Sequence, residues 1–184
     1  MLGGSRDFSV VENDIPWFEP IADFMCDAID KNIPIFGSCL GIQVIAKALG
    51  GEVILDNEHR EVGTYLIILN EDGHQDLLFA KFPKTFLTQM GHKCRVSVLP
   101  EDAVSLASSD LCPVHAFKLK NKMVYATQFH PELNYHDNVK RLKYYYQNYH
   151  HASQKESLEE MLMKFKEDDT NSTLLSDFIM LVAG

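Results

Sequence analysis

The chain has 184 residues, 46% hydrophobic and 23% charged, a balance typical of one globular domain and unlike a disordered or fibrous protein. Lysine and arginine number 17 against 26 aspartates and glutamates, and the net charge of −9 disfavours a nucleic-acid partner, because an acidic surface repels a phosphate backbone. The longest apolar run, residues 178–183, is far shorter than the ~18 residues of a membrane span, and residues 1–7 lack the apolar core of a signal peptide, so we expect no membrane partner.

The first predicted element is a helix that begins near Pro16 and Trp17. Its apolar residues recur at the steps of three and four that place side chains on one face of a helix. The apolar run at residues 33–36, ended by Gly37, predicts a buried strand, and residues 40–49, stopped by Gly50 and Gly51, predict a second helix. A strand, a tight turn and a helix in this order indicate a parallel α/β sheet.

The middle of the chain is rich in predicted strands, at residues 65–69, 86–90, 104–107, 116–119 and 123–129, with turns at Asp72-Gly73 and Asn121-Lys122. A helix is expected at 137–149, and the tail from 157 to 184 holds two short helical patterns. The expected fold is therefore α/β, with a mostly parallel sheet flanked by helices and an antiparallel excursion over residues 65–129. Residues 1–150 would form the main domain, and residues 151–184 a helical C-terminal extension, for which a cap on the domain is favoured over a dedicated partner site.

Cys39 is the candidate nucleophile, in the run Gly37-Ser38-Cys39-Leu40-Gly41 between the predicted strand and helix. A nucleophile at that place lies on a strained turn, and the flanking glycines permit the turn and leave room for a substrate. The N-terminus of the following helix stabilises a thiolate and offers N–H groups to an oxyanion. The alternative is an inert core cysteine, which is common, but the strand–turn–helix context favours the nucleophile. The cysteines, irregularly spaced at Cys26, Cys39, Cys94 and Cys112, are expected to be reduced thiols in a cytoplasmic protein.

His130 is the best-placed base for this nucleophile, because it closes the predicted strand at 123–129 and Glu132 follows two residues later. Positions two apart in an extended chain face the same side, so Glu132 can orient the imidazole of His130. The alternative is a histidine and a glutamate at the surface end of a strand. A metal site is less favoured here, because third and fourth ligands are not apparent.

The segments Gly37-Ser38-Cys39-Leu40-Gly41-Ile42-Gln43 and Phe129-His130-Pro131-Glu132 together resemble the class I (triad) glutamine amidotransferases, in the GMP-synthase-type branch that includes free-standing domains. Weaker matches lie at residues 46–51, 61–63, 76–79, 91–92 and 106–109, and the resemblance extends from residue 1 to about 149. It implies a flavodoxin-like fold without a metal or organic cofactor. It also implies site roles: Cys39 as nucleophile, His130 as base, Glu132 as its orienting carboxylate, Gly4 and Leu40 as oxyanion donors, and Gln43 as a substrate contact.

The resemblance implies hydrolysis of the glutamine side-chain amide through a γ-glutamyl thioester, with release of ammonia. Nothing in the chain resembles a synthase module, so the acceptor of ammonia would lie on a separate synthase or acceptor subunit. Two alternatives stay open. One is a γ-glutamyl hydrolase acting on peptides or conjugates, and the other is a catalytically silent amidotransferase-like domain that binds a partner.

Two departures from the family pattern shape these expectations. The family begins with a strand–helix–strand portion before the turn at Gly3 and Gly4, whereas this sequence begins at the turn. We therefore expect either a longer natural chain or a shortened variant, with weak activity and aggregation or homo-oligomerisation through an exposed sheet edge. Lys93 and Cys94 stand where glycine and aspartate usually follow His92, in the loop that lines the glutamine pocket.

Overall fold

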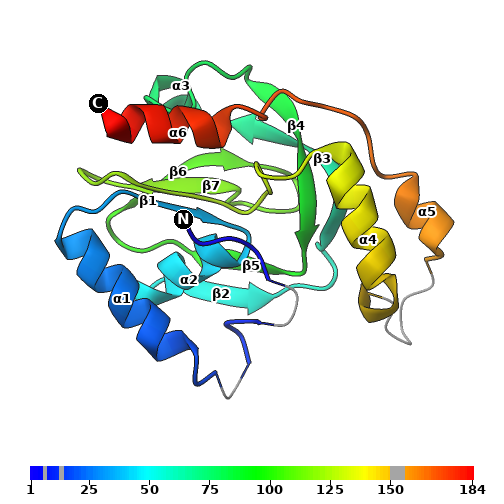
Figure 1. Cartoon of the computed structure of the whole chain (residues 1–184), viewed down its shortest axis with the longest axis horizontal. Coiled ribbons are helices and arrows are strands. Elements are labelled where there is room, and N and C mark those ends of the chain that lie inside the picture. The colour runs from blue at the N-terminus through cyan, green and yellow to red at the C-terminus, as the bar shows by residue number, and fades with distance from the viewer. Residues whose placement is uncertain (6–7, 13–14, 150–155) are drawn as a thin grey trace.

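The computed structural model of the protein describes residues 1–5, 8–12, 15–149 and 156–184 (Figure 1). The predicted boundary between residues 150 and 151 lies outside these ranges. The helices are α1 (Phe18–Asp30), α2 (Leu40–Ala48), α3 (Glu71–Gln75), α4 (Tyr135–Tyr149), α5 (Leu158–Leu162) and α6 (Leu174–Ala183). The strands are β1 (Ile35–Ser38), β2 (Glu52–Leu55), β3 (Glu61–Leu69), β4 (Thr85–His92), β5 (Cys94–Val98), β6 (Ala103–Ser108), β7 (Ala116–Leu119) and β8 (Val124–Thr127).

The main sheet has six strands in the order β1-β8-β7-β6-β3-β4, and β2 pairs with β5 in a separate two-stranded sheet. Only the β1–β8 pairing of the six named strands is parallel, and their other pairings are antiparallel. The α/β class and the antiparallel excursion over residues 65–129 are confirmed, and the sheet is mixed, with the parallel pairing of these strands confined to β1 and β8. The physical reason is the length of the connections, because those between β6, β7 and β8 are shorter than the roughly dozen residues that a parallel crossover needs.

Three further elements differ from the sequence-based expectation. Strands β2 and β5 were not predicted, and they stabilise each other by pairing across a long stretch of chain. Helix α3 replaces the turn expected at Asp72-Gly73, because the side chain of Asn70 caps it by accepting a hydrogen bond from the N–H of Gly73 at 2.8 Å. The remaining predicted helices and strands are present, with shifts at their ends.

Helices cover both faces of the β1–β8 part of the sheet. Ile35 and Val124 pack into the core that α1 and α2 share, whereas Phe36 and Tyr125 pack on the opposite face with Phe178 of α6. Figure 1 shows α6 and α1 on opposite sides of these strands. This alternation follows from the two-residue period of a strand, which sends successive side chains to opposite faces.

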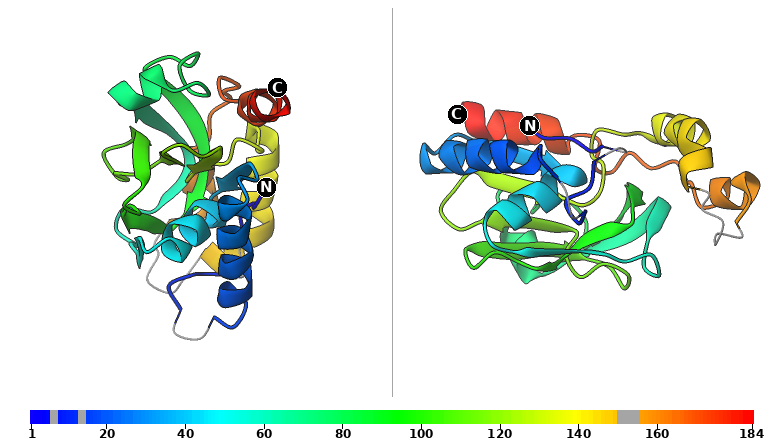
Figure 2. Two further views of the ribbon diagram at one scale, coloured as in Figure 1. Left: turned by 90° about the vertical axis from the view of Figure 1, so that its left-hand side faces the viewer. Right: turned by 90° about the horizontal axis from the view of Figure 1, so that it is seen from below.

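Helices α4 and α5 lie together beyond one end of the sheet (Figure 2). Leu142 of α4 packs with Met161 of α5, with Phe165 just after it and with Val62 of β3. Both α5 and α6 therefore contribute apolar side chains to the packing of the structure. In the described part of the chain, no helix is long and apolar enough to cross a membrane.

The first residues run beside β1. The N–H of Leu2 donates to the carbonyl oxygen of Phe36 at 2.9 Å, and the N–H of Ser38 donates to that of Leu2 at 2.9 Å. This parallel bridge places Gly3 and Gly4 next to the end of β1, where the candidate nucleophile lies.

Candidate active site

Cys39 occupies a strained turn between β1 and α2. Its backbone has φ 52° and ψ −99°, in the positive-φ region that residues other than glycine rarely adopt. The N–H of Cys39 donates to the carbonyl oxygen of Thr127 at 2.8 Å, which ties the turn to β8. Gly41 leaves room for the N-terminal segment beside the turn, because a Cβ there would lie 2.3 Å from the carbonyl oxygen of Leu2. The structure thus contains the strained strand–turn–helix that the sequence predicts.

His130 and Glu132 lie together after β8. Nδ1 of His130 is 2.6 Å from Oε1 of Glu132, and the N–H of His130 donates to the carbonyl oxygen of Gln89 at 2.9 Å. Ser38 was not predicted as a site residue, yet its hydroxyl donates to the same Oε1 at 3.2 Å. Because Ser38 directly precedes Cys39, the carboxylate is held by both the nucleophile turn and the imidazole.

The electrostatics of Cys39, His130 and Glu132 favour an ion pair between thiolate and imidazolium. Burial raises the pKa of Cys39, but the charge and hydrogen bond of His130 and the charge of Arg141 outweigh it and leave the pKa lowered. Burial lowers the pKa of His130, but Cys39 and Glu132 raise it to about 9. Burial also raises the pKa of Glu132, and the hydrogen bond and charge of His130 reverse this. A thiolate is the reactive form of cysteine, so these shifts suit a nucleophile.

Arg141 of α4 is a site residue that the sequence analysis did not find. Its Nη1 lies 2.9 Å from Nε2 of His130. A guanidinium only donates hydrogen bonds, so Nε2 accepts here and His130 is neutral, with its hydrogen on Nδ1 facing Glu132. An imidazolium carries hydrogens on both nitrogens and cannot accept from Arg141. The contact with Arg141 and the Cys39–His130 ion pair therefore belong to different states of the site.

A cavity of about 580 Å³ opens beside His130. Its lining includes two basic side chains of α4 and several hydroxyl groups. The lining residues are Gly4, Ser5, His130, Glu132, Leu133, Asp137, Lys140, Arg141, Tyr144 and Tyr145. Cys39 is only 5% exposed and lies outside this lining. A substrate that enters the cavity therefore meets His130 and the basic residues of α4 before it reaches the thiol.

The other predicted site residues surround the turn. Leu40 is the first residue of α2, so its N–H is one of those that a helix leaves without an internal partner. Gln43 is buried, and its Nε2 donates to the carbonyl oxygen of Cys94 at 3.0 Å and to Oε1 of Gln128 at 3.3 Å. Because the protein already engages the Nε2 group, a contact between Gln43 and a substrate would use its carbonyl oxygen.

Gly4 lies against both Cys39 and His130, and replacing it tests how tightly the site is packed. A Cβ at position 4 would lie 2.7 Å from Cε1 of His130 and 3.3 Å from Cβ of Cys39. We expect Gly4→Ala to lower kcat by about 100-fold, the effect typical of a catalytic group displaced by about 1 Å. The matched control is Gly3→Ala, whose Cβ meets no atom within 4 Å. Equal turnover of the two variants would contradict this placement of Gly4.

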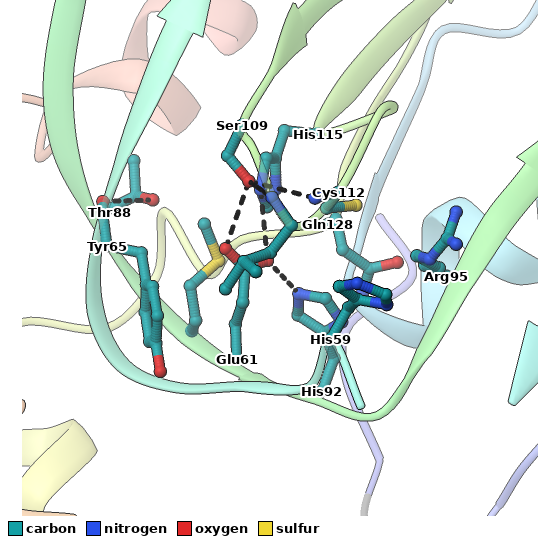
Figure 3. Close-up of polar contacts among 12 residues, drawn as sticks. His59, Glu61, Tyr65, Thr88, His92, Arg95, Ser109, Cys112, His115 and Gln128 are labelled. Atoms are coloured by element: carbon teal, nitrogen blue, oxygen red, sulfur yellow. Dashed lines mark hydrogen bonds and ion pairs between the residues drawn. The ribbon is translucent and has the colours of Figure 1, made fainter. Parts of the chain in front are cut away.

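A second buried polar cluster lies apart from the triad and was not predicted. It contains Glu61, His92, Cys112 and His115, whose ligand atoms lie within 4.8 Å of one another (Figure 3). Burial raises the pKa of Glu61, but hydrogen bonds from His115 and His92 lower it to about 2. Burial raises the pKa of Cys112 to about 12. Cys112 and His115 lie three positions apart, but Glu61 and His92 come from two other segments, so no single run of the sequence marks the cluster.

The fold and the site define a class of protein. A thiol on a strand–helix turn of an α/β sheet, with a paired histidine and glutamate after the adjacent strand, is the arrangement of cysteine-dependent triad proteins. The sequence profile of the family described as glutamine amidotransferase class-I matches residues 10–165. The chain belongs to this family.

The comparisons with individual proteins agree with the family. The chain is 38% identical over 123 residues to a glutamine-hydrolysing GMP synthase subunit of Methanococcus aeolicus, covering 67% of this chain and 63% of that protein. The protein of the same description from Methanocaldococcus jannaschii is 40% identical over 106 residues, which are 58% of this chain and 54% of its own length. The chain thus spans only about half to three fifths of these relatives. A glutamine amidotransferase from Thermotoga maritima superposes with a TM-score of 0.77 at 23% identity, over 97% of this chain and 74% of its own, which shows a shared fold.

Proposed function

We propose that the protein hydrolyses the side-chain amide of glutamine, with Cys39 as nucleophile, His130 as base and Glu132 as the group that orients the base. One observation carries the proposal. Cys39 lies in a positive-φ turn at the start of α2, and the imidazole that lowers its pKa is itself bound to Glu132 at 2.6 Å. These are the parts that thiol-dependent acyl transfer requires.

The proposed reaction has two halves. The thiolate of Cys39 attacks the side-chain carbonyl carbon of glutamine, and the N–H groups of Gly4 and Leu40 stabilise the oxyanion that forms. His130 gives its proton to the leaving nitrogen, so the C–N bond breaks and ammonia departs from a γ-glutamyl thioester. His130 then takes a proton from water, hydroxide attacks the thioester, and glutamate leaves as the thiol is restored.

The ammonia that this reaction releases needs an acceptor, which we place on a second polypeptide. The relatives from Methanococcus aeolicus and Methanocaldococcus jannaschii are each described as one subunit of a glutamine-hydrolysing GMP synthase. We propose by analogy that a separate synthase subunit receives the ammonia from this chain. The cysteines Cys26, Cys39, Cys94 and Cys112 are free thiols, which fits the cytoplasmic location we propose.

The direct test compares substrates with the purified chain. We expect release of ammonia and glutamate from free glutamine, and slower release of amine from γ-glutamyl peptides. Faster hydrolysis of the peptides would identify a γ-glutamyl hydrolase, and hydrolysis of neither would favour the silent partner-binding domain. A glutamine-like chloroketone should add its mass to the peptide that contains Cys39, whereas labelling of Cys94 would contradict the assignment.

Arg141 provides a second test, through the binding of substrate. The α-carboxylate of glutamine needs a cation, and Arg141 lines the cavity with His130. If the α-carboxylate of glutamine pairs with Arg141, the guanidinium moves away from Nε2 of His130. His130 can then form the ion pair with the thiolate of Cys39. We expect Arg141→Gln to raise KM for glutamine by about 10- to 100-fold, the value of one charge-assisted hydrogen bond. The matched control is Lys143→Gln, an exposed basic residue of the same helix outside the cavity lining, and an equal effect there would contradict this role.

A further inference from the structure

The cluster of Glu61, His92, Cys112 and His115 is completely enclosed, at 0%, 5%, 0% and 0% exposure. Its members converge from three parts of the fold. Glu61 is the first residue of β3, His92 is the last residue of β4, and Cys112 and His115 lie in the connection between β6 and β7. Figure 3 shows His92, His115 and Ser109 gathered around the carboxylate of Glu61, with Cys112 beside them.

The hydrogen bond at Nδ1 of His92 determines whether its Nε2, which faces Glu61, carries a hydrogen or a lone pair. Its Nδ1 lies 3.1 Å from the carbonyl oxygen of Cys94, and because a carbonyl only accepts, Nδ1 carries the hydrogen. In the neutral ring, Nε2 then presents its lone pair to Oε2 of Glu61, at 2.8 Å. Two acceptors at this distance require a proton or a cation between them. A histidine held by a backbone carbonyl at one nitrogen, with a free lone pair at the other, is the usual state of a metal ligand.

The other members can complete such a site. Nε2 of His115 lies 3.1 Å from the same Oε2 of Glu61. Nε2 of His115 also lies 2.9 Å from Oγ of Ser109, and Nδ1 has no hydrogen-bond partner among the described residues, so binding a metal through Nε2 requires the ring hydrogen to move to Nδ1. All four ligand atoms lie within 4.8 Å of one another. A tetrahedral zinc site with bonds of about 2.0–2.3 Å separates its ligand atoms by about 3.3–3.8 Å, so small side-chain shifts suffice.

We propose that Glu61, His92, Cys112 and His115 form a structural site for one divalent cation of the zinc type. Imidazole, thiolate and carboxylate together favour zinc over calcium or magnesium, which prefer oxygen ligands. Cys112 would bind as a thiolate, so its S–H bond breaks, the proton passes to solvent, and the sulfur bonds the metal. The charges of thiolate, carboxylate and dication then sum to zero inside the core. The ion would join the β3–β4 hairpin to the β6–β7 connection, and the proposal does not depend on glutamine hydrolysis.

The test must separate this cluster from the triad, because Cys39 with His130 and Glu132 could also bind zinc. The parent protein is therefore the Cys39→Ala variant, produced in medium supplemented with zinc or with cobalt, so that the enclosed site is loaded as the chain folds. We expect one bound metal per chain by mass spectrometry of the metal content. The cobalt form should show a thiolate-to-cobalt charge-transfer band and tetrahedral d–d bands. Thermal unfolding should move to higher temperature than in protein produced with a chelator.

Variants made in the parent identify the ligands. Cys112→Ser should lose the charge-transfer band, and His115→Gln should reduce the retained metal at least tenfold after dialysis against a weak chelator. Cys26→Ser, which removes a thiol of α1 outside the cluster, should retain both signals. A folded parent without bound metal overturns the proposal, and so does a charge-transfer band that persists in Cys112→Ser. If Cys112→Ser does not fold, X-ray absorption spectroscopy of the zinc-loaded parent counts the sulfur neighbours of the metal instead. One sulfur among nitrogen and oxygen neighbours supports the site, and any other sulfur number overturns it.

Discussion

Replacing Cys39 with alanine is expected to abolish glutamine hydrolysis and to leave the fold intact. The thiol carries the only sulfur in the proposed triad, and without it no thioester can form. The remaining oxyanion donors and imidazole do not supply a nucleophile of comparable strength. Alanine removes one buried atom and keeps the Cβ of the turn, so the cost to packing is small.

Ammonia release from purified wild type and variant measures this effect, and circular dichroism checks the fold. Cys26→Ala is the matched control, because Cys26 is a free thiol of α1 whose Sγ donates to the carbonyl oxygen of Ala48 at 3.8 Å instead of contacting a residue of the triad. It should keep most of the wild-type turnover. Wild-type activity in Cys39→Ala would remove Cys39 from the mechanism, whereas a wild type without turnover would favour the silent domain.

Replacing His130 with alanine is expected to have the second largest effect, a loss of about 10²–10⁴-fold in kcat. The variant loses both the group that removes the proton of the thiol and the group that protonates the leaving ammonia. Glu132→Ala should lose less, because the imidazole remains as the base and loses only the carboxylate that orients it at Nδ1. Equal or reversed losses in the two variants would mean that the roles are wrongly assigned.

The reactivity of Cys39 toward a neutral alkylating agent gives an independent check that needs no turnover. His130 is the main group that lowers the pKa of Cys39, so its loss should raise that pKa. The midpoint of the alkylation rate against pH should therefore move to higher pH in His130→Ala than in wild type. An unchanged midpoint would show that His130 and the thiol do not interact, whatever the result with glutamine.

The candidate site divides into a part that local sequence determines and a part that it does not. Cys39 with its flanking glycines, and His130 with Glu132 two residues later, are short-range patterns. Their geometry follows from backbone rules that act within a few residues, namely the strained strand–helix turn and the same-face spacing of a strand. Sequence therefore predicted which of these groups would be oriented together. Arg141 carried no such signal, because a single arginine on a helix is ordinary and only the packing of α4 brings it to Nε2.

The elements of the fold likewise fall into those that the local sequence predicts and those that depend on tertiary contacts. Amphipathic spacing predicted α1 and α4, the strand–turn–helix pattern ended by Gly50 and Gly51 predicted α2, and apolar runs predicted β1 and most strands of the main sheet, because these signals lie within one element or its neighbour. The pairing of β2 with β5 and the convergence of Glu61, His92, Cys112 and His115 were decided only by tertiary structure. In each case the stabilising partner lies far away in the sequence. Hydrogen bonds and ion pairs between distant segments depend on three-dimensional distance, which the order of residues does not record.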